Sequence, residues 1–83
     1  MPEADTKSGK TTSSNYTTKI IYDANNNPTY IGDATIGSLT SASVWRIKKL
    51  TYDASNNPTN IEWANGNSNF DKIMDSYLTY TYS

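Results

Sequence analysis

The feature that most constrains the fold of this 83-residue chain is an internal duplication. Residues 19–31 (KIIYDANNNPTYI) and residues 49–61 (KLTYDASNNPTNI) are identical at 9 of 13 positions when they are aligned at a spacing of 30 residues. Two copies are too few for a solenoid, because stacked repeats need about three or more units to bury a continuous core. The duplication therefore predicts one domain over residues 16–83, made of two similar units (19–48 and 49–78) and a closing strand.

Each copy has the pattern of a β-hairpin. In residues 16–22, β-branched and aromatic side chains recur with a period of two, which is typical of a half-buried strand. Asp23 and the asparagines after it favour a turn because their side chains bond their own backbone, and Pro28 cannot donate to a strand ladder. We expect a short return strand over residues 29–31 that ends at Gly32. The second copy predicts a strand over 44–52, a turn over 53–58 and a return strand over 59–63.

The remaining segments complete an all-β domain. Residues 32–43 are rich in small side chains and predict an ordered loop, and residues 70–75 predict a short helix. A final alternating strand is expected near the C-terminus. Together these elements predict a small antiparallel sandwich or open barrel of about five strands, built on two hairpins with one short helical turn. Ser68 or Asn69 is the predicted cap of the short helix. Leu78, Tyr80 and Tyr82 are the alternating residues of the predicted final strand.

The composition supplies few residues for a hydrophobic core. Thr, Ser and Asn account for 32 residues, whereas Ile, Leu, Val and Phe account for 12. Seven Tyr and two Trp compensate in part, because an aromatic side chain buries a large area and keeps a polar end. Burial of so few apolar side chains only roughly balances the entropy lost on ordering the chain. With no cysteine for disulfides, the domain is expected to gain stability from neighbouring subunits.

The absence of histidine and cysteine restricts the possible chemistry. It removes the imidazole base, the thiolate nucleophile and every His/Cys metal site. We therefore expect a protein that is not an enzyme and has no cofactor or metal. Seven Lys and Arg against eight Asp and Glu provide no basic field for phosphates, so no nucleic-acid partner is expected.

Residues 1–15 contain no large apolar side chain after the initiator Met and predict a flexible N-terminal arm. A secretory signal needs an apolar segment of about 7–15 residues, and a membrane-spanning helix needs about 20. The sequence has neither, so we expect no membrane association and synthesis and assembly in a cytoplasm.

Asp23, Asn25 and Asn27 imitate the start of a calcium-binding loop. The rest of that pattern fails, because Pro28 replaces the glycine of the sharp turn and Ala34 replaces the bidentate glutamate. The interpretation as a plain hairpin turn is therefore favoured. The segment also resembles the YD-x-x-G-N-x-T hairpin of YD-repeat proteins, with asparagine (residues 26 and 56) in place of the glycine.

Two further groups of residues have the composition of a catalytic or a nucleic-acid-binding site. Asp71 and Asp75 are four residues apart on the predicted helix, so they could form an acid/base pair, although a solvated helix face explains them as well. Arg46, Lys48 and Lys49 beside Trp45 could form a platform for single-stranded nucleic acid. By strand alternation, however, Arg46 and Lys48 lie on the opposite face from Trp45, which favours a charged edge strand or the rim of a protein interface.

Seven tyrosines are difficult to bury completely in so small a sheet, so some are expected on a surface where Tyr and Trp anchor interfaces. A protein interface is favoured over a glycan site because the chain needs partners for stability. The expected interface residues are Tyr16, Tyr30, Trp45, Arg46, Lys48, Trp63, Tyr80 and Tyr82.

Residues 30–83 contain YIG at 30–32, SVWRIK at 43–48, IEWA at 61–64 and LTYTYS at 78–83. In this order the features resemble a group of small proteins encoded by tailed bacteriophages, with Met74 where that resemblance predicts a tryptophan. The resemblance implies a minor structural component of the virion, in contact with major capsid or tail proteins and present as a homo-oligomer or in many copies. It implies no catalytic residues.

Three functions follow as hypotheses. The first is a capsid decoration or cement protein that stabilises the assembled phage head. The second is a tail, neck or fibre-base component of the virion. The third is a glycan-binding module for host attachment, in which Trp45, Trp63 and exposed tyrosines stack on sugars and Asn65, Asn67 and Asn69 supply polar contacts.

Overall fold

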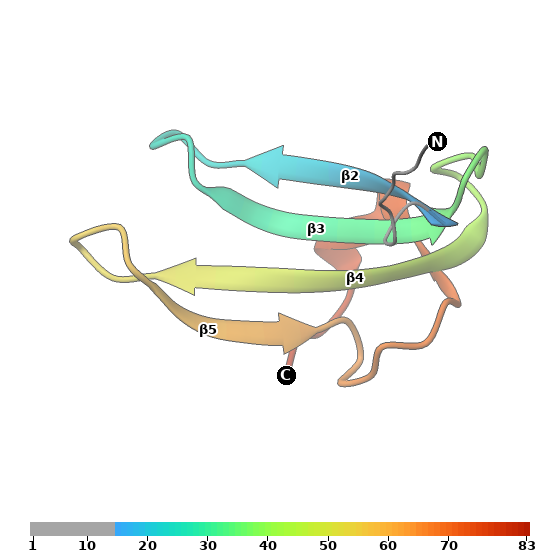
Figure 1. Cartoon of the computed structure of the whole chain (residues 1–83). Helices are drawn as coiled ribbons and strands as arrows, with labels where there is room; N and C mark the ends of the chain where they lie inside the picture. Colours follow the sequence, from blue (N-terminus) through green and yellow to red (C-terminus); the bar gives the residue numbers. More distant parts are fainter. Residues whose placement is uncertain (1–14) are drawn as a thin grey trace, which may run out of the picture.

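The computed structural model describes residues 15–83, so the predicted arm lies outside the described residues except for Asn15. These residues form one antiparallel sheet in the order β2-β3-β4-β5, and a short strand, β6, pairs with β4 (Figure 1). The predicted all-β fold of five antiparallel strands on two hairpins is confirmed, and the sheet is open rather than closed into a barrel. The elements are β2 (Tyr16–Tyr22), β3 (Pro28–Thr35), β4 (Ser43–Tyr52), β5 (Pro58–Trp63), β6 (Lys72–Ile73) and the 3-10 helix η2 (Met74–Thr79).

The two hairpin turns repeat each other in their hydrogen bonds. In the first, the N–H of Asp23 donates to the carbonyl of Asn27 (2.9 Å), and Asp23 Oδ1 accepts from the N–H groups of Asn25 (2.8 Å) and Asn27 (2.9 Å). Asp53 makes the corresponding bonds in the second turn, all at 2.9 Å. The N–H of Asn57 is the main cause that lowers the pKa of the Asp53 carboxyl below its ordinary value.

The other repeated residues also serve the turn. Asn26 has a left-handed backbone with φ of 63°, a conformation that asparagine tolerates better than most residues. Thr29 Oγ1 donates to the carbonyl of Ile21 (3.1 Å) beside a β-bulge. The duplication is therefore a duplicated turn motif. The equivalent groups of the second copy are Asn56 (φ 65°) and the pair of Thr59 and Thr51 (3.2 Å).

The core lies on one face of the sheet, where η2 and the C-terminal residues cover it (Figure 1). Trp45 and Ile47 point to this face from β4 and are 2% and 0% exposed. Met74 of η2 contacts the sheet at Gly32, where an added Cβ would collide with Met74 Sδ and lie 3.1 Å from Trp45 Cε3. The fully buried apolar residues are Ala34, Trp45, Ile47, Ala64 and Met74.

The return strand does not end at Gly32, as the sequence predicts, but continues to Thr35. The glycine provides room for Met74 and Trp45 rather than a break, so β3 extends through it. The predicted ordered loop is correspondingly shorter, and its N–H groups are used in turns, as in the bond from Ser38 to the carbonyl of Thr35 (3.0 Å).

The predicted short helical turn is present as η2, but it covers residues 74–79 rather than 70–75, and the predicted final strand does not form among the described residues. Residues 72–73 form β6 instead, and η2 begins at Met74 without a side-chain cap. Leu78 lies in η2 and is 70% exposed, and the only remnant of the final strand among residues 15–83 is the isolated bridge between Ala64 and Tyr82.

Tyrosine hydroxyls explain why the C-terminal residues fold back under the sheet. The N–H of Ile73 donates to the hydroxyl of Tyr80 (2.8 Å), and the hydroxyl of Tyr82 donates to the carbonyl of Tyr77 (2.7 Å). The Tyr30 ring meets the Tyr77 and Tyr82 rings edge-on, with centroids 4.8 and 5.5 Å away. These contacts provide hydrogen-bond partners for the tyrosine hydroxyls inside the covered layer. In a regular alternating strand, the same hydroxyls would lie at the surface of the sheet.

The stability of the domain is expected to fall at alkaline pH because of Tyr82. Burial, followed by its tyrosine neighbours, raises the pKa of Tyr82 above the ordinary value of 10.0. The unfolded chain therefore loses this proton first, so the contribution of Tyr82 to the free energy of unfolding is constant below about pH 9 and falls above about pH 10. We expect urea unfolding at several pH values to show a smaller alkaline loss for Tyr82→Phe than for the natural chain. Tyr22→Phe, at a side chain that is 57% exposed, is the control, and equal alkaline losses for all three proteins would contradict this role of Tyr82.

Candidate interaction surface on the open face of the sheet

No element among residues 15–83 covers the face of the sheet opposite the core, which we call the open face. Strand alternation assigns side chains to it, since Trp45 and Ile47 occupy the covered face. Strand register then arranges the open-face side chains in two rows across the sheet. The rows are Thr18–Asp33–Arg46 and Ile20–Ile31–Lys48–Trp63.

Arg46 is the centre of an aromatic and charged cluster on the open face. Its Cζ atom lies 4.8 Å from the ring centroid of Phe70, 5.2 Å from that of Tyr16 and 5.9 Å from that of Trp63. The Tyr16 and Phe70 rings stack on each other, with centroids 5.4 Å apart. A guanidinium among ring faces is favourable, since it meets the negative side of each ring quadrupole. We call Tyr16, Asp33, Arg46, Trp63 and Phe70 the Arg46 cluster.

Asp33 orients the guanidinium within the Arg46 cluster. Its Oδ2 lies 3.2 Å from Arg46 Nε, while its Oδ1 accepts from the hydroxyl of Thr18 (2.8 Å). The two side chains of the ion pair are 30% and 20% exposed, so the pair is partly desolvated and its geometry is fixed from two strands. The cluster is therefore built before any partner arrives, which lowers the entropic cost of binding.

Lys48 extends the basic character of the open face. Its Nζ lies 5.7 Å from the centroid of the Trp63 ring, and no salt bridge within residues 15–83 involves it. Ile20, which is 39% exposed, lies in the same row, and Ile61, which is 58% exposed, follows on β5. The open face thus combines exposed apolar side chains with an ammonium group that can meet a partner's carboxylate.

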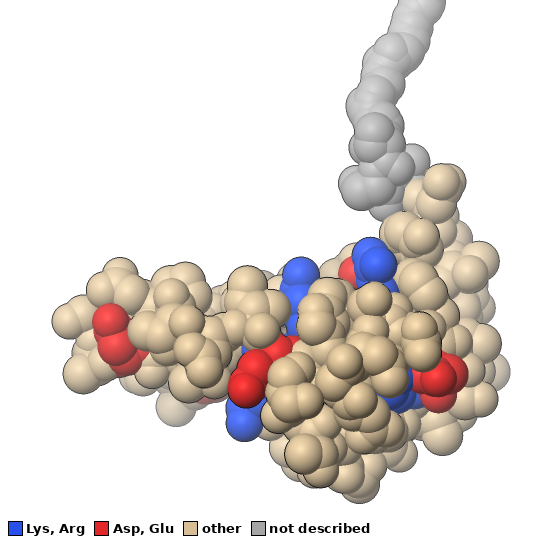
Figure 2. Space-filling model, turned by 90° about the horizontal axis from the view of Figure 1, so that it is seen from below, with Lys and Arg blue, Asp and Glu red and all other residues tan. Residues whose placement is uncertain are grey.

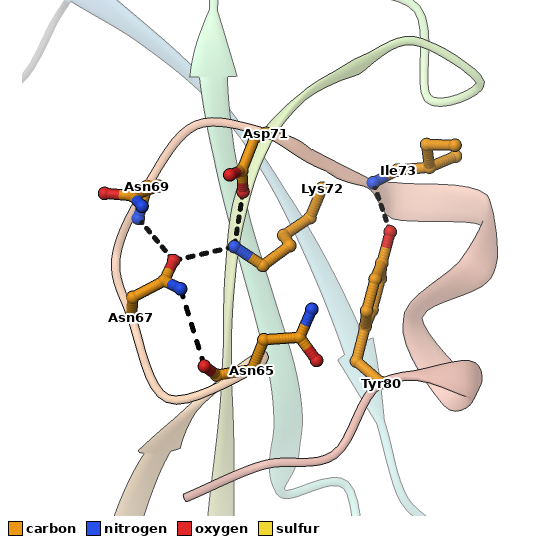
Figure 3. Close-up of polar contacts among 7 residues, drawn as sticks. All are labelled: Asn65, Asn67, Asn69, Asp71, Lys72, Ile73 and Tyr80. Atoms are coloured by element: carbon orange, nitrogen blue, oxygen red, sulfur yellow. Dashed lines mark hydrogen bonds and ion pairs between the residues drawn. The ribbon is translucent and has the colours of Figure 1, made fainter.

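The loop that carries Phe70 to the open face is fixed by a buried lysine (Figure 3). Lys72 is 3% exposed, and its Nζ donates to Asn67 Oδ1 (2.8 Å) and pairs with Asp71. Asn67 Oδ1 also accepts from the N–H of Asn69 (3.1 Å). Because an ammonium group is buried only when it is paired, these bonds hold the loop in one conformation and position Phe70 against Tyr16.

The structure brings four of the eight predicted interface residues together on the open face: Tyr16, Arg46, Lys48 and Trp63. Trp45 is corrected to a core residue, because it is 2% exposed and its Nε1 donates to the carbonyl of Leu39 (3.0 Å). The other three predicted residues are half-buried on the covered face, where they pack with the core. They are Tyr30, Tyr80 and Tyr82.

Sequence reasoning missed Phe70 and Asp33 as members of the Arg46 cluster. Phe70 begins the segment that the sequence predicts as a helix, but η2 starts only at Met74, so the contact of Phe70 across the sheet has no signal in the sequence. Asp33 had one available signal, since β3 pairs it with Arg46 and opposite charges directly across two strands attract. The prediction that Arg46 and Trp45 lie on opposite faces is confirmed, but Arg46 obtains its ring contacts from other elements.

The structure does not bring together the predicted acid pair. Asp71 lies before β6 and pairs with Lys72, whereas Asp75 lies in η2 and its N–H donates to the carbonyl of Thr40 (3.0 Å). Because η2 begins only at Met74, Asp71 lies outside it and the two carboxylates do not share a helix face. Within residues 15–83, no three His, Cys, Asp or Glu side chains converge in a way that could hold a metal ion.

The ends of the two hairpins form a narrow projection beyond the thicker body (Figures 1 and 2). Asn27 Nδ2 donates to Asn56 Oδ1 (3.0 Å), and the hydroxyl of Tyr52 donates to the carbonyl of Pro28 (2.7 Å), which ties the hairpins together. A groove of about 370 Å³ runs between them, lined mainly by amide, carboxylate and tyrosine side chains. Figure 2 shows that uncharged side chains dominate the visible surface and that acidic atoms lie near the end of the projection.

Comparison of the chain with protein-family models, with curated proteins and with solved structures finds no match. In the part of the chain that the structure describes, no helix has the length and apolar character needed to cross a membrane. The candidate function therefore rests on the geometry of the open face and on the resemblance carried by the sequence.

Proposed function

We propose that this chain is a non-enzymatic structural protein of a tailed-phage virion that attaches to other virion proteins through its open face. The observation that carries the proposal is the Arg46 cluster on an uncovered sheet face. A sheet with apolar side chains on both faces is stable when both are covered, and here η2 covers one of them. A partner that covers the other face would complete the domain.

The residue types of the Arg46 cluster support a protein partner. Arg, Trp and Tyr are the residues that contribute most binding energy in protein interfaces, and all three lie in this cluster. Lys48 gives the face a positive side, because the charges of Asp33 and Arg46 are already paired with each other. An acidic and apolar surface is the complementary partner.

Attachment to the capsid as a decoration or cement protein is the favoured location. A small, nearly neutral domain with a marginal core suits a protein that becomes stable on an assembled lattice, and the resemblance to minor virion proteins agrees with it. A tail, neck or fibre-base position would use the same face and is the alternative within the virion.

Removal of one ring of the cluster tests the proposal. Phe70→Ala is expected to reduce attachment about tenfold or more, because it removes a stacking partner of Tyr16 and a ring contact of Arg46. The measurement is co-sedimentation of the purified chain with phage particles assembled without it. Leu78→Ala is the matched control, since Leu78 is equally apolar, 70% exposed and in η2 on the covered side. Equal attachment of both variants and the natural chain, or no saturable attachment of the natural chain, would contradict the proposal.

The groove between the hairpin ends favours glycan binding as a second candidate function. Its lining includes Asn25, Asn27, Tyr30 and Tyr52, which are suitable for a neutral sugar. The side chain of Asn67 near Trp63 is instead engaged in the Lys72 loop. Saturable binding of a neutral oligosaccharide that shifts the NMR signals of the groove and leaves those of the Arg46 cluster unchanged would favour this function over attachment.

A further inference from the structure

The two edges of the sheet differ in how they are protected. At the β5 edge, the N–H of Trp63 donates to the carbonyl of Ser83 (3.0 Å) and the N–H of Ser83 donates to the carbonyl of Trp63 (3.1 Å). The C-terminal residues thus occupy part of this edge, and Pro58 begins the strand without an N–H to offer. These are devices that prevent the pairing of one sheet with another.

The β2 edge has none of these devices within residues 15–83. No described strand or loop pairs with its outer side. Its seven residues, YTTKIIY, contain no proline and one charge, Lys19. A strand of β-branched and aromatic residues with an unpaired edge is a template for a further strand.

Strand geometry identifies the backbone groups that face outward. Thr29 Oγ1 donates to the carbonyl of Ile21, so the backbone groups of Ile21 point toward β3. Because backbone groups alternate sides along a strand, those of Thr18 and Ile20 point away from the sheet. The same alternation on β5 agrees with the observed bond from Trp63 to Ser83.

We propose that the β2 edge pairs antiparallel with β2 of a second copy of this chain, about a two-fold axis at Thr18. This register places Tyr16 opposite Ile20 of the partner subunit and Lys19 opposite Thr17 of the partner subunit. Each opposed pair then lies on one face of the joined sheet, an aromatic ring meets a β-branched side chain, and no like charges oppose each other.

The neighbouring registers are less favourable for the same strand. An axis at Lys19 would place two ammonium groups directly opposite each other, which destabilises a pair. An axis at Ile20 would bring Tyr22 into the new ladder, where the bulge between Ile21 and Tyr22 disturbs the strand. Charge and bulge together favour the axis at Thr18 over the axes at Lys19 and Ile20.

Pairing about this axis joins the two open faces on the same side of one continuous eight-stranded main sheet, four strands from each copy. The two Arg46 clusters then face the same direction. The inference does not depend on the virion assignment, since it follows from the edge alone and would stand if attachment to particles failed.

Proline substitution at an outward-facing position tests the pairing. Ile20→Pro removes an N–H that points away from β3, so the internal ladder keeps its bonds. Ile61→Pro does the same on the β5 edge and is the matched control. By sedimentation velocity at tens of micromolar of the full chain, the natural protein and Ile61→Pro are expected to have the mass of a dimer and Ile20→Pro that of a monomer, with unchanged β-sheet circular dichroism.

Amide hydrogen exchange on the natural chain keeps the inference testable if Ile20→Pro does not fold. The amides of Thr18 and Ile20 are expected to exchange at least tenfold more slowly at high than at low protein concentration. A monomer in which these amides exchange freely would overturn the inference. A second result would also overturn it: a monomer in which the amides of Thr18 and Ile20 exchange slowly in the full chain but freely after residues 1–14 are deleted. The N-terminal segment of the same chain would then be the partner of the β2 edge.

Discussion

Replacing Trp45 with alanine is expected to remove most of the folding stability of the domain at room temperature. The indole is 2% exposed, contacts the face of the sheet at Gly32 and donates its N–H to the carbonyl of Leu39. Truncation of a buried Trp costs about 3–5 kcal/mol, whereas whole domains are stable by about 5–15 kcal/mol. With five fully buried apolar residues in residues 15–83, this domain belongs near the low end of that range. Circular dichroism and urea titration measure the loss.

The second tryptophan provides the matched control for this prediction. Trp63 lies on the open face beside Arg46 and Lys48, and its backbone bonds to Ser83 survive substitution. Trp63→Ala is therefore expected to lose about 1–2 kcal/mol and remain folded. If Trp45→Ala melts within a few degrees of the natural chain, or if Trp63→Ala is the more damaging change, the assignment of the core to the covered face is wrong.

Replacing Arg46 with alanine is expected to remove attachment while leaving the domain folded. The side chain contacts three rings and the Asp33 carboxylate, so its removal dismantles the centre of the surface. Central Arg anchors of protein interfaces are worth about 2 kcal/mol or more, which corresponds to about a 30-fold loss of affinity. The same change costs about 1–2 kcal/mol of folding stability, because Asp33 keeps only the bond from Thr18. Co-sedimentation with particles and urea unfolding measure the two effects separately.

Lys49 is the matched control for Arg46. It lies on the same strand but on the covered side, where its Nζ is 6.0 Å from the Tyr30 ring centroid. Lys49→Ala removes one positive charge and one cation–π contact without changing the open face, so attachment is expected to stay within about twofold. Arg46→Lys keeps the charge but loses the planar guanidinium and is expected to be intermediate. Equal losses for Arg46→Ala and Lys49→Ala would mean that net charge, rather than the Arg46 cluster, controls attachment.

Local sequence determined much of the fold in a way that could be predicted. The β2 boundaries, Tyr16–Tyr22, follow from period-two alternation, and the two turns follow from Asp and Asn chemistry that acts within six residues. The placement of Arg46 and Trp45 on opposite faces also follows from alternation alone. These features depend on neighbours in sequence, so a single chain contains the information for them.

Features that depend on distant contacts could not be predicted in the same way. The sequence predicts that the strand ends at Gly32. In the structure the strand continues, because Met74, 42 positions later in the chain, occupies the space above the glycine. Tyr80 and Tyr82 alternate like a strand, but their hydroxyls find Ile73 and Tyr77 in the covered layer. Phe70 reaches Tyr16 because Lys72 fixes a loop through Asn67. In each case tertiary contact overrides a local pattern.

The most direct test of the central claim, that the open face is the attachment surface, is oxidative footprinting of side chains on the free chain and on the chain bound to particles. Trp63, Phe70 and Tyr16 are expected to become protected on binding, whereas Leu78 and Ile36, which are 70% and 64% exposed, keep their oxidation rates. Protection confined to Leu78 and the covered side, with unchanged oxidation of Trp63 and Phe70, would contradict the claim.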